Sequence, residues 1–111
     1  MSSAVRNLPV AKLGELVAAG AEGHQLVDVR EPWEHAAANI AHFQLLPMSQ
    51  TPLWARTLDP ALPTVVLCHA GVRSRAVAEY LTGELGFTEV YNVTGGIDAY
   101  SRLVDKSVPL Y

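Results

Sequence analysis

The residue whose chemistry stands out is Cys68, the only cysteine in the chain. It follows the apolar run 64–67 and opens the sequence Cys-His-Ala-Gly-Val-Arg-Ser, residues 68–74. The apolar run predicts a buried strand, and residues 75–85 predict a helix. A thiol between a strand and a helix lies where backbone N–H groups and the helix dipole converge, and both stabilise an anion. The sequence therefore predicts a nucleophilic thiolate at position 68.

The residues after Cys68 offer groups that would hold a charged sulfur. The predicted cradle is formed by the backbone N–H groups of His69, Ala70, Gly71, Val72, Arg73 and Ser74. Gly71 lets the backbone bend toward the sulfur without a side-chain clash. Arg73 adds a permanent positive charge, and Ser74 either caps the following helix or hydrogen-bonds the sulfur. His69 either interacts with a bound molecule or points to water.

Strand-like and helix-like segments alternate along the chain, which predicts an α/β domain with a mostly parallel sheet. The expected strands are residues 25–29, 43–46, 64–67 and 89–93. The expected helices are residues 11–19, 51–58, 75–85 and 97–104, together with one that begins within residues 31–35. In the helix after Cys68, the apolar residues Val77, Leu81 and Leu85 recur four positions apart. We expect this face, with Tyr80 alongside, to pack on the sheet.

Length and composition limit the classes of protein to which the chain can belong. Its 111 residues suit one compact domain spanning residues 1–111, and half of them are hydrophobic, which predicts a packed core. The net charge of −3, without a basic block, gives no support for nucleic-acid binding. No segment approaches the ~20 apolar residues that span a membrane. A single cysteine allows no intrachain disulfide and fits a reducing compartment, so we expect a cytoplasmic protein.

Three segments form a pattern along the chain. They read Leu-Val-Asp-Val-Arg-Glu-Pro-Trp-Glu at 26–34, Cys-His-Ala-Gly-Val-Arg-Ser at 68–74 and Asn-Val-Thr-Gly-Gly-Ile at 92–97. In this order and spacing they resemble the single-domain rhodaneses, which are sulfurtransferases, over about residues 8–103. The resemblance implies a five-stranded, mostly parallel sheet flanked by helices on both faces. It also implies that the catalytic loop joins the fourth strand to its helix.

The resemblance implies sulfur transfer, and a thiolate at Cys68 agrees with that chemistry. The thiolate would attack the outer sulfur of a small anionic donor such as thiosulfate, or of a persulfide, and so become a persulfide itself. A second nucleophile, cyanide or a thiol, would then remove that sulfur in a ping-pong reaction. The reaction needs an activated sulfur, a cradle for the terminal sulfur and an open mouth. It requires no cofactor, because the chemistry belongs to the cysteine.

The spacing between Cys68 and Arg73 separates this reaction from a related one. Protein phosphatases with a cysteine nucleophile resemble Cys-x5-Arg, in which the larger loop encloses a phosphate, whereas four residues separate the two side chains here. The shorter loop favours a cradle for a single sulfur over phosphatase or arsenate reductase action. The loop also differs from the Cys-Gly-x-Gly-x-Thr pattern typical of mercaptopyruvate sulfurtransferases, which favours thiosulfate, polysulfide or a protein persulfide as donor.

Charged residues at the end of the first expected strand form a second candidate group. Asp28 and Arg30 lie at the sheet edge that also holds the Cys68 loop, because parallel strands end on the same side. The resemblance implies that they brace this loop, and an ordinary ion pair at a strand end is the alternative. Glu31 and Glu34 are expected to be charges at a helix N-terminus, unfavourable to a dianionic donor if they flank the mouth.

The remaining residue types give simpler expectations. Trp33, Trp54 and Tyr100 are expected to pack in the interior. His24, His35 and His42 have no second ligand at a metal-binding spacing, so the sequence assigns no metal. A rival to the enzyme hypothesis stays open, in which the domain only binds a protein partner or hands it sulfur in a relay.

Overall fold

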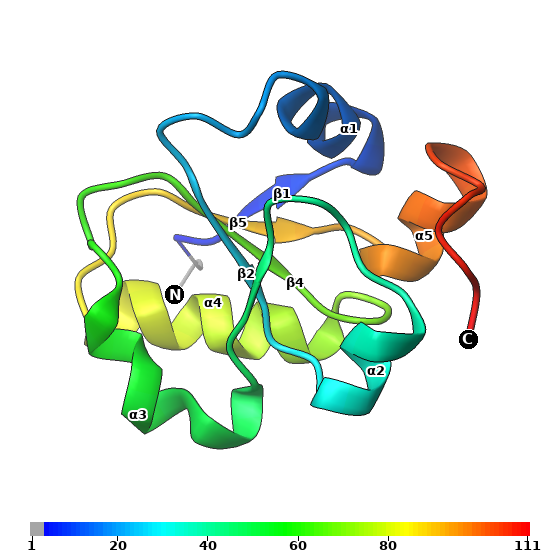
Figure 1. Cartoon of the computed structure of the whole chain (residues 1–111). Coiled ribbons are helices and arrows are strands. Elements are labelled where there is room, and N and C mark those ends of the chain that lie inside the picture. Colours follow the sequence, from blue (N-terminus) through cyan, green and yellow to red (C-terminus); the bar gives the residue numbers. More distant parts are fainter. Residues whose placement is uncertain (1–3) are drawn as a thin grey trace.

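The computed structural model describes residues 4–111, which form one five-stranded parallel sheet. The strands are β1 (Arg6–Leu8), β2 (Gln25–Asp28), β3 (Gln44–Leu45), β4 (Thr64–Leu67) and β5 (Val90–Val93). They lie in the order β1-β5-β4-β2-β3, and every neighbouring pair is parallel (Figure 1). The expected α/β class and the five parallel strands are therefore confirmed.

Helices cover both faces of this sheet. They are α1 (Val10–Ala18), α2 (Pro32–Ala37), α3 (Thr51–Trp54), α4 (Val72–Glu84) and α5 (Gly96–Leu103), with short 3-10 turns η1 (Met48–Gln50) and η2 (Ala55–Thr57). Figure 1 shows α1 and α5 on one side of the sheet and α3 and α4 on the other. Within residues 4–111, no helix is long and apolar enough to cross a membrane.

The central strand β4 shows how the two layers are held together. Its side chains alternate, so that Val65 and Leu67 pack in the core beneath α1 and α5 while Val66 and Cys68 pack beneath α4. All four residues of β4 are buried, as expected for a parallel strand covered on both faces. Each large apolar side chain buried here stabilises the fold by about 1.5–3 kcal/mol. Cys68 therefore starts from the most rigid part of the sheet.

Some elements differ from their expected form. The edge strand β1 was not among the strands expected from periodicity, because its three residues are mostly polar and exposed and it pairs only with β5. Along α4, Val77 and Leu81 are buried and Leu85 packs against the same core, as expected. Tyr80 instead lies 37% exposed, because it falls one position beyond that buried face.

The segment after α5 returns across the molecule toward α2. The Ser101 hydroxyl donates a short hydrogen bond to the carbonyl of Val108, and Asp105 accepts hydrogen bonds from the backbone N–H and the hydroxyl of Ser107. These contacts hold the segment close to α5. As a result, Tyr111 lies beside residues that precede it by more than forty positions in the chain.

Candidate active site

Cys68 lies directly after β4, at the sheet edge where the neighbouring strand β2 also ends. The last residue of β2, Asp28, is paired with Leu67 in the parallel register, so both strands deliver polar residues to one place. The sulfur of Cys68 accepts hydrogen bonds from the Gly71 N–H at 3.1 Å and from the Ser74 hydroxyl at 3.2 Å. Both donors stabilise negative charge on the sulfur.

The expectation of an open mouth is wrong for this structure, since Cys68 is only 1% exposed. Its side chain belongs to the apolar core beneath α4, which surrounds it on the side away from the loop. Among the described residues, the sulfur makes no hydrogen bond to another loop N–H group. The sulfur is therefore covered by the side chains that surround the loop and α4.

Gly71 determines how the loop turns into α4. Its φ of 101° lies in the region that side-chain-bearing residues avoid, and a Cβ there would lie 3.3 Å from the Val93 carbonyl oxygen. The sharp turn lets α4 begin at Val72, three residues before the expected start at 75. Arg73 and Ser74 consequently belong to the first helical turn, from which the Ser74 side chain points back to the sulfur.

Ser74 connects the sulfur to β5 through Asn92. The Ser74 hydroxyl lies 2.5 Å from the Asn92 side-chain oxygen, and the Asn92 amide donates to the carbonyl of Gly71 at 3.0 Å. A hydroxyl has one proton, so Ser74 can donate to the sulfur or to Asn92 but not to both. A negatively charged sulfur is the stronger acceptor, which favours the bond to Cys68 once the thiol is ionised.

The first turn of α5 supports the loop from behind. The N–H groups of Ile97 and Asp98 donate to the carbonyl oxygens of Cys68 and His69 at 3.0 and 3.1 Å. A Cβ on Gly96, whose φ is 61°, would lie 2.5 Å from the carbonyl oxygen of Cys68 and would also collide with His69. Backbone-to-backbone packing thus explains Gly96, the second glycine of the third motif, whereas a Cβ on Gly95, whose φ is 78°, would lie 2.6 Å from the Ala99 side chain. We call Gly71, Ser74, Asn92 and Gly96 the cradle.

The arginine of the loop is held by a carboxylate from α2. Arg73 forms a two-pronged ion pair with Glu34, with N–O distances of 2.6 and 2.8 Å. The hydrogen bonds from Arg73 lower the pKa of Glu34 to about 2, and the pair likewise raises the pKa of Arg73 above its ordinary value. Glu34 is therefore ionised and engaged at neutral pH. We expected Glu34 to be only a charge at the helix N-terminus, but it also binds Arg73.

Asp28 and Arg30 form a fully buried ion pair that continues this network. Arg30 donates to both carboxylate oxygens of Asp28, at 2.7–3.2 Å, and to the carbonyl oxygens of Glu34 and Ala38. Burial alone would lower the pKa of Arg30, but hydrogen bonds to Asp28 and Tyr111 hold it above its ordinary value. The pair fastens α2 to the sheet, and α2 carries the Glu34 side chain that binds Arg73.

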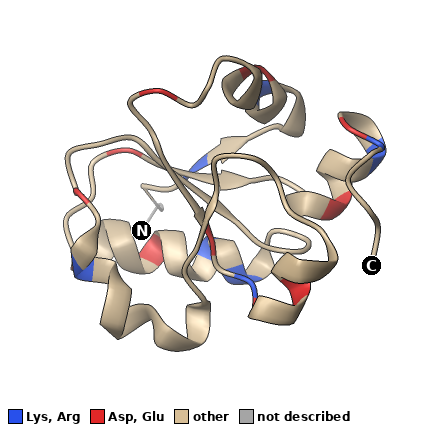
Figure 2. Ribbon diagram, in the orientation of Figure 1, with Lys and Arg blue, Asp and Glu red and all other residues tan. Residues whose placement is uncertain are grey.

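Tyr111 closes the network from the end of the described chain. Its hydroxyl accepts a hydrogen bond from Arg30 at 3.0 Å and donates one to Glu34 at 2.9 Å. Figure 2 shows basic and acidic segments meeting where the chain leaves β2, passes through α2 and reaches the start of α4. We call Asp28, Arg30, Glu34, Arg73 and Tyr111 the charge network.

Aromatic rings and one exposed valine lie next to the loop. The ring of Tyr111 meets His69 edge-on at 4.6 Å and Trp33 at 5.9 Å. Trp33 is 66% exposed, so the expectation that it packs inside is wrong, whereas Trp54 and Tyr100 are buried as expected. Val72 is 79% exposed. The Nδ1 atom of His69 is buried and has no hydrogen-bond partner among the described residues, so it does not point to water.

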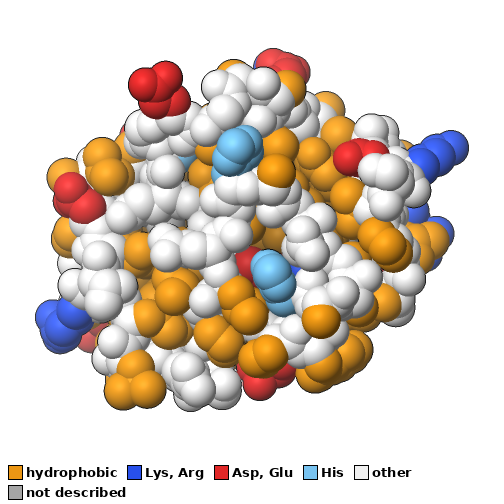
Figure 3. Space-filling view, in the orientation of Figure 1, with side chains coloured by type: hydrophobic (Ala, Val, Ile, Leu, Met, Phe, Trp, Pro, Cys, Tyr) orange, Lys and Arg blue, Asp and Glu red, His pale blue; other side chains and the backbone are white. Residues whose placement is uncertain are grey.

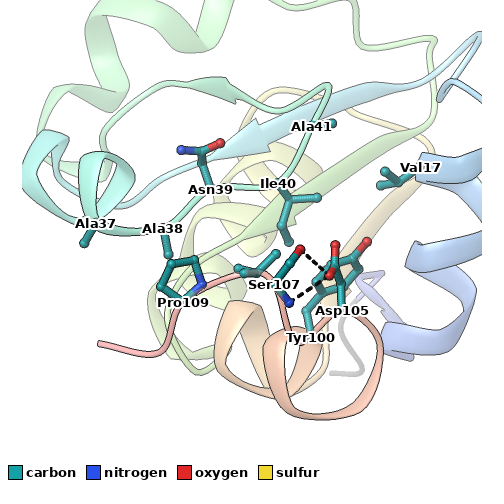
Figure 4. Close-up of a pocket in the computed structure, with 11 residues that line it drawn as sticks. Val17, Ala37, Ala38, Asn39, Ile40, Ala41, Tyr100, Asp105, Ser107 and Pro109 are labelled. Atoms are coloured by element: carbon teal, nitrogen blue, oxygen red, sulfur yellow. Dashed lines mark hydrogen bonds between the residues drawn. The ribbon is translucent and has the colours of Figure 1, made fainter.

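A cavity of about 410 Å³ lies elsewhere in the molecule, between α1, the loop after α2 and the segment after α5. Figure 4 shows Ile40, Tyr100 and Pro109 around it, with Ser107 bonded to Asp105 at its side. Its lining includes none of the residues 68–74, so it is separate from the site at Cys68. Within the described part of the chain, no three His, Cys, Asp or Glu side chains are grouped to hold a metal ion.

The structure brings most of the residues selected from the sequence to one place. Cys68, the loop after it, and the Asp28–Arg30 pair share one edge of the sheet. Of the six loop N–H groups predicted to hold the sulfur, however, only that of Gly71 lies within hydrogen-bond distance. Sequence reasoning missed the contacts of Glu34, Asn92 and Tyr111 with this site. Asn92 stood in the third motif, which was its one available signal.

Comparison with known proteins agrees with this geometry. The sequence model of the rhodanese-like domain matches residues 12–103. The chain belongs to the rhodanese-like family. A thiosulfate sulfurtransferase, GlpE, from Pseudomonas entomophila is 35% identical over 86 residues, which cover 78% of each chain.

The chain also matches a much longer relative and a solved structure of similar length. The rhodanese-like/PpiC domain-containing protein 12 of Arabidopsis thaliana, a chloroplastic protein, is 47% identical over 91 residues, and these cover 78% of this chain but 30% of the relative. The chain thus spans less than a third of that relative. A solved rhodanese-related protein from Thermoplasma volcanium has a TM-score of 0.75 at 29% identity, covering 96% of this chain and 97% of the other.

Proposed function

We propose that this rhodanese-like protein is a sulfurtransferase that carries a sulfane sulfur as a persulfide on Cys68. The Cys68 thiolate attacks the outer sulfur of a donor such as thiosulfate, a bond forms between the two sulfurs, and sulfite leaves with the electron pair of the broken S–S bond. A thiolate or cyanide then attacks the outer sulfur of the persulfide and restores the Cys68 thiolate.

The observation that carries this proposal is the pair of donors aimed at one sulfur. The Gly71 N–H and the Ser74 hydroxyl both lie within hydrogen-bond distance of Cys68, directly after a buried strand and at the start of α4. Fixed donors of this kind stabilise charge on an attacking thiolate and on the persulfide that follows. The kinship with a thiosulfate sulfurtransferase at 35% identity supports the same chemistry.

The test is the intact mass of the protein after incubation with thiosulfate and then with cyanide. We expect a gain of about 32 Da, one sulfur atom, that disappears when cyanide is added. Peptide mapping should place the added sulfur on Cys68. No adduct with thiosulfate, a polysulfide or a small persulfide would contradict the proposal and favour a rhodanese fold that only binds a partner.

The setting of this activity is part of the same proposal. We propose one domain over residues 1–111, with no cofactor, working in a reducing compartment such as the cytoplasm, because a chain with one cysteine and no possible intrachain disulfide fits such a compartment. The donor is a small anionic sulfur compound, the acceptor is a thiol or cyanide, and a protein partner in a sulfur relay can take either place.

A further inference from the structure

Two arginines at this sheet edge, Arg73 and Arg30, are each paired with a carboxylate. Arg73 follows Cys68 by five positions and interacts with it electrostatically, but its guanidinium is bound through two hydrogen bonds by Glu34. Arg30 is fully buried and bound by Asp28. Each pair therefore contributes almost no net positive charge at the loop.

Two further arginines are engaged elsewhere. Arg75 donates to the neutral amide oxygen of Asn7 on β1, so it keeps its charge but holds its guanidinium toward β1, and Arg102 pairs with Asp98 on α5. On the face in Figure 3, apolar side chains cover much of the lower half, over α2 and α3, and the prominent basic side chains lie at the left and right edges.

We infer that Glu34 sets the charge of the donor that this site accepts, by occupying Arg73 and so disfavouring dianions such as thiosulfate against donors of lower charge. The inference rests on the proposed sulfur transfer and adds the donor class to it. The favoured donor is an organic sulfane compound with at most one negative charge at the reacting end. The exposed Trp33 and Val72 offer apolar surface for its organic part.

The transfer step balances in the same way for either donor. The Cys68 thiolate forms a bond to the outer sulfur, the bond from that sulfur to the sulfonyl sulfur breaks, and the leaving group departs with its electron pair. Thiosulfate releases sulfite, and an organic thiosulfonate releases a sulfinate. No outside oxidant or reductant takes part, so a comparison of the two donors isolates their charge.

Methanethiosulfonate and thiosulfate are suitable probes. They differ by one methyl group in place of one oxygen, so their sizes are similar while their charges are −1 and −2. The rate constant for formation of the Cys68 persulfide is measured by intact mass with each probe. For each variant we take the ratio of the two rate constants, methanethiosulfonate over thiosulfate. The compounds differ in intrinsic reactivity, but this difference is the same in every variant and cancels when the ratios are compared.

The decisive variant is Glu34→Gln, which releases Arg73 while keeping a side chain of the same shape. We expect the ratio of methanethiosulfonate to thiosulfate rate constants to fall about five-fold, because the freed charge attracts the dianion more strongly. The matched control is Glu31→Gln, which removes a carboxylate from the same helix start without touching Arg73. Its ratio should change less than about two-fold.

Two results would overturn the inference. One is a folded Glu34→Gln variant that keeps the wild-type ratio, and the other is an equal change in Glu31→Gln, which would assign the effect to overall charge. If Glu34→Gln does not fold, Arg73→Ala supplies a second measurement. This variant leaves the Glu34 carboxylate without its cation, so the ratio of methanethiosulfonate to thiosulfate rate constants should rise, and an unchanged or lower ratio would overturn the inference.

The same experiment separates this inference from the proposed function. A wild-type protein that forms no adduct with either probe would overturn the sulfurtransferase proposal, and the donor class would fall with it. If the adduct forms but the ratio of the two rate constants is the same in the wild type and in Glu34→Gln, only the inferred donor class is overturned.

Discussion

The cradle and the charge network meet in the loop after Cys68 and are assembled in different ways. The cradle is built chiefly from backbone groups and short side chains in the loop and in the motif that contains Asn92 and Gly96. The charge network joins side chains that lie up to 81 positions apart, from Arg30 to Tyr111. The cradle therefore surrounds the sulfur with hydrogen-bond donors and close backbone packing, and the network pairs the one arginine of the loop with a carboxylate.

Replacement of the sulfur has the largest expected effect, because every other residue acts through it. Cys68→Ser should form no persulfide with any donor, since a hydroxyl is a poor nucleophile for sulfur at neutral pH. Unfolding in urea should stay cooperative, because serine is close to cysteine in size. Sulfur transfer by Cys68→Ser would contradict the mechanism and move the chemistry out of the cradle altogether.

Gly96→Ala tests the backbone part of the cradle. A methyl group there meets the carbonyl oxygens of Cys68 and His69 at a positive φ, so we expect a loss of about 2–4 kcal/mol in the free energy of unfolding. Gly83→Ala is the matched control, because its new methyl group would meet nothing within 4 Å in α4. The free energy of unfolding of this control should rise by about 0.5–1 kcal/mol. Equal losses in both variants would contradict the close packing of Gly96 against the loop backbone.

Acid should weaken the charge network before it affects the cradle. Arg73 lowers the pKa of Glu34 to about 2, so the stabilisation from this pair is complete above the ordinary pKa of a glutamate and is lost as the pH falls. The free energy of unfolding of the wild-type protein should drop toward that of Glu34→Gln between about pH 5 and pH 2, by up to about 3 kcal/mol. Urea titrations at several pH values measure this. If the difference in free energy of unfolding between the wild type and Glu34→Gln stays constant with pH, the ion pair between Glu34 and Arg73 is contradicted.

A double-mutant cycle measures the same pair at neutral pH. Arg73→Ala leaves the Glu34 carboxylate buried and unpaired beside the sulfur, so we expect a loss of about 2 kcal/mol in stability and slower loading by thiosulfate. Adding Glu34→Gln to Arg73→Ala should restore most of the loading rate. Arg75→Ala serves as control because Arg75 hydrogen-bonds to Asn7 on β1 and not to Glu34, and it should leave loading unchanged. Additive effects of the two changes would contradict the coupling.

The same contrast explains what the sequence could predict. The cradle was predictable at Gly71 and Ser74, since residues 68–74 are contiguous and a strand, a glycine and a helix start place donors near the thiol. The parts played by Asn92 and Gly96 depend on how β5 and α5 pack against the loop. The charge network was predictable only in part. Asp28 and Arg30 were recognised from their strand, but the approach of Glu34 to Arg73 and of Tyr111 to both depends on how α2 and the segment after α5 pack.

Sequence patterns likewise predicted the buried centre of the sheet better than its edge strand and the helix start at Gly71. The buried strand β4 was found with its expected bounds, because four apolar residues in succession have few alternatives. The edge strand β1 has no such signal, since its residues are polar and only its pairing with β5 makes it a strand. Likewise, the start of α4 was placed three residues late because the turn at Gly71 is sharper than its residue type alone reveals.

Ser74→Ala has the smallest expected effect and most directly tests whether the cradle acts on the sulfur. The variant removes a hydroxyl whose one proton goes either to Cys68 or to the side-chain oxygen of Asn92, so one hydrogen bond is lost and we expect a loss of about 1 kcal/mol in stability. Persulfide formation should slow about ten-fold with both thiosulfate and methanethiosulfonate, because a neutral donor stabilises the thiolate equally for either. Ser49→Ala, at an exposed position that contacts only Glu31, is the matched control and should load at the wild-type rate. A change in the ratio of the two probes in Ser74→Ala would mean that the cradle also selects donors by charge, and the division of roles between the cradle and the charge network would then be wrong.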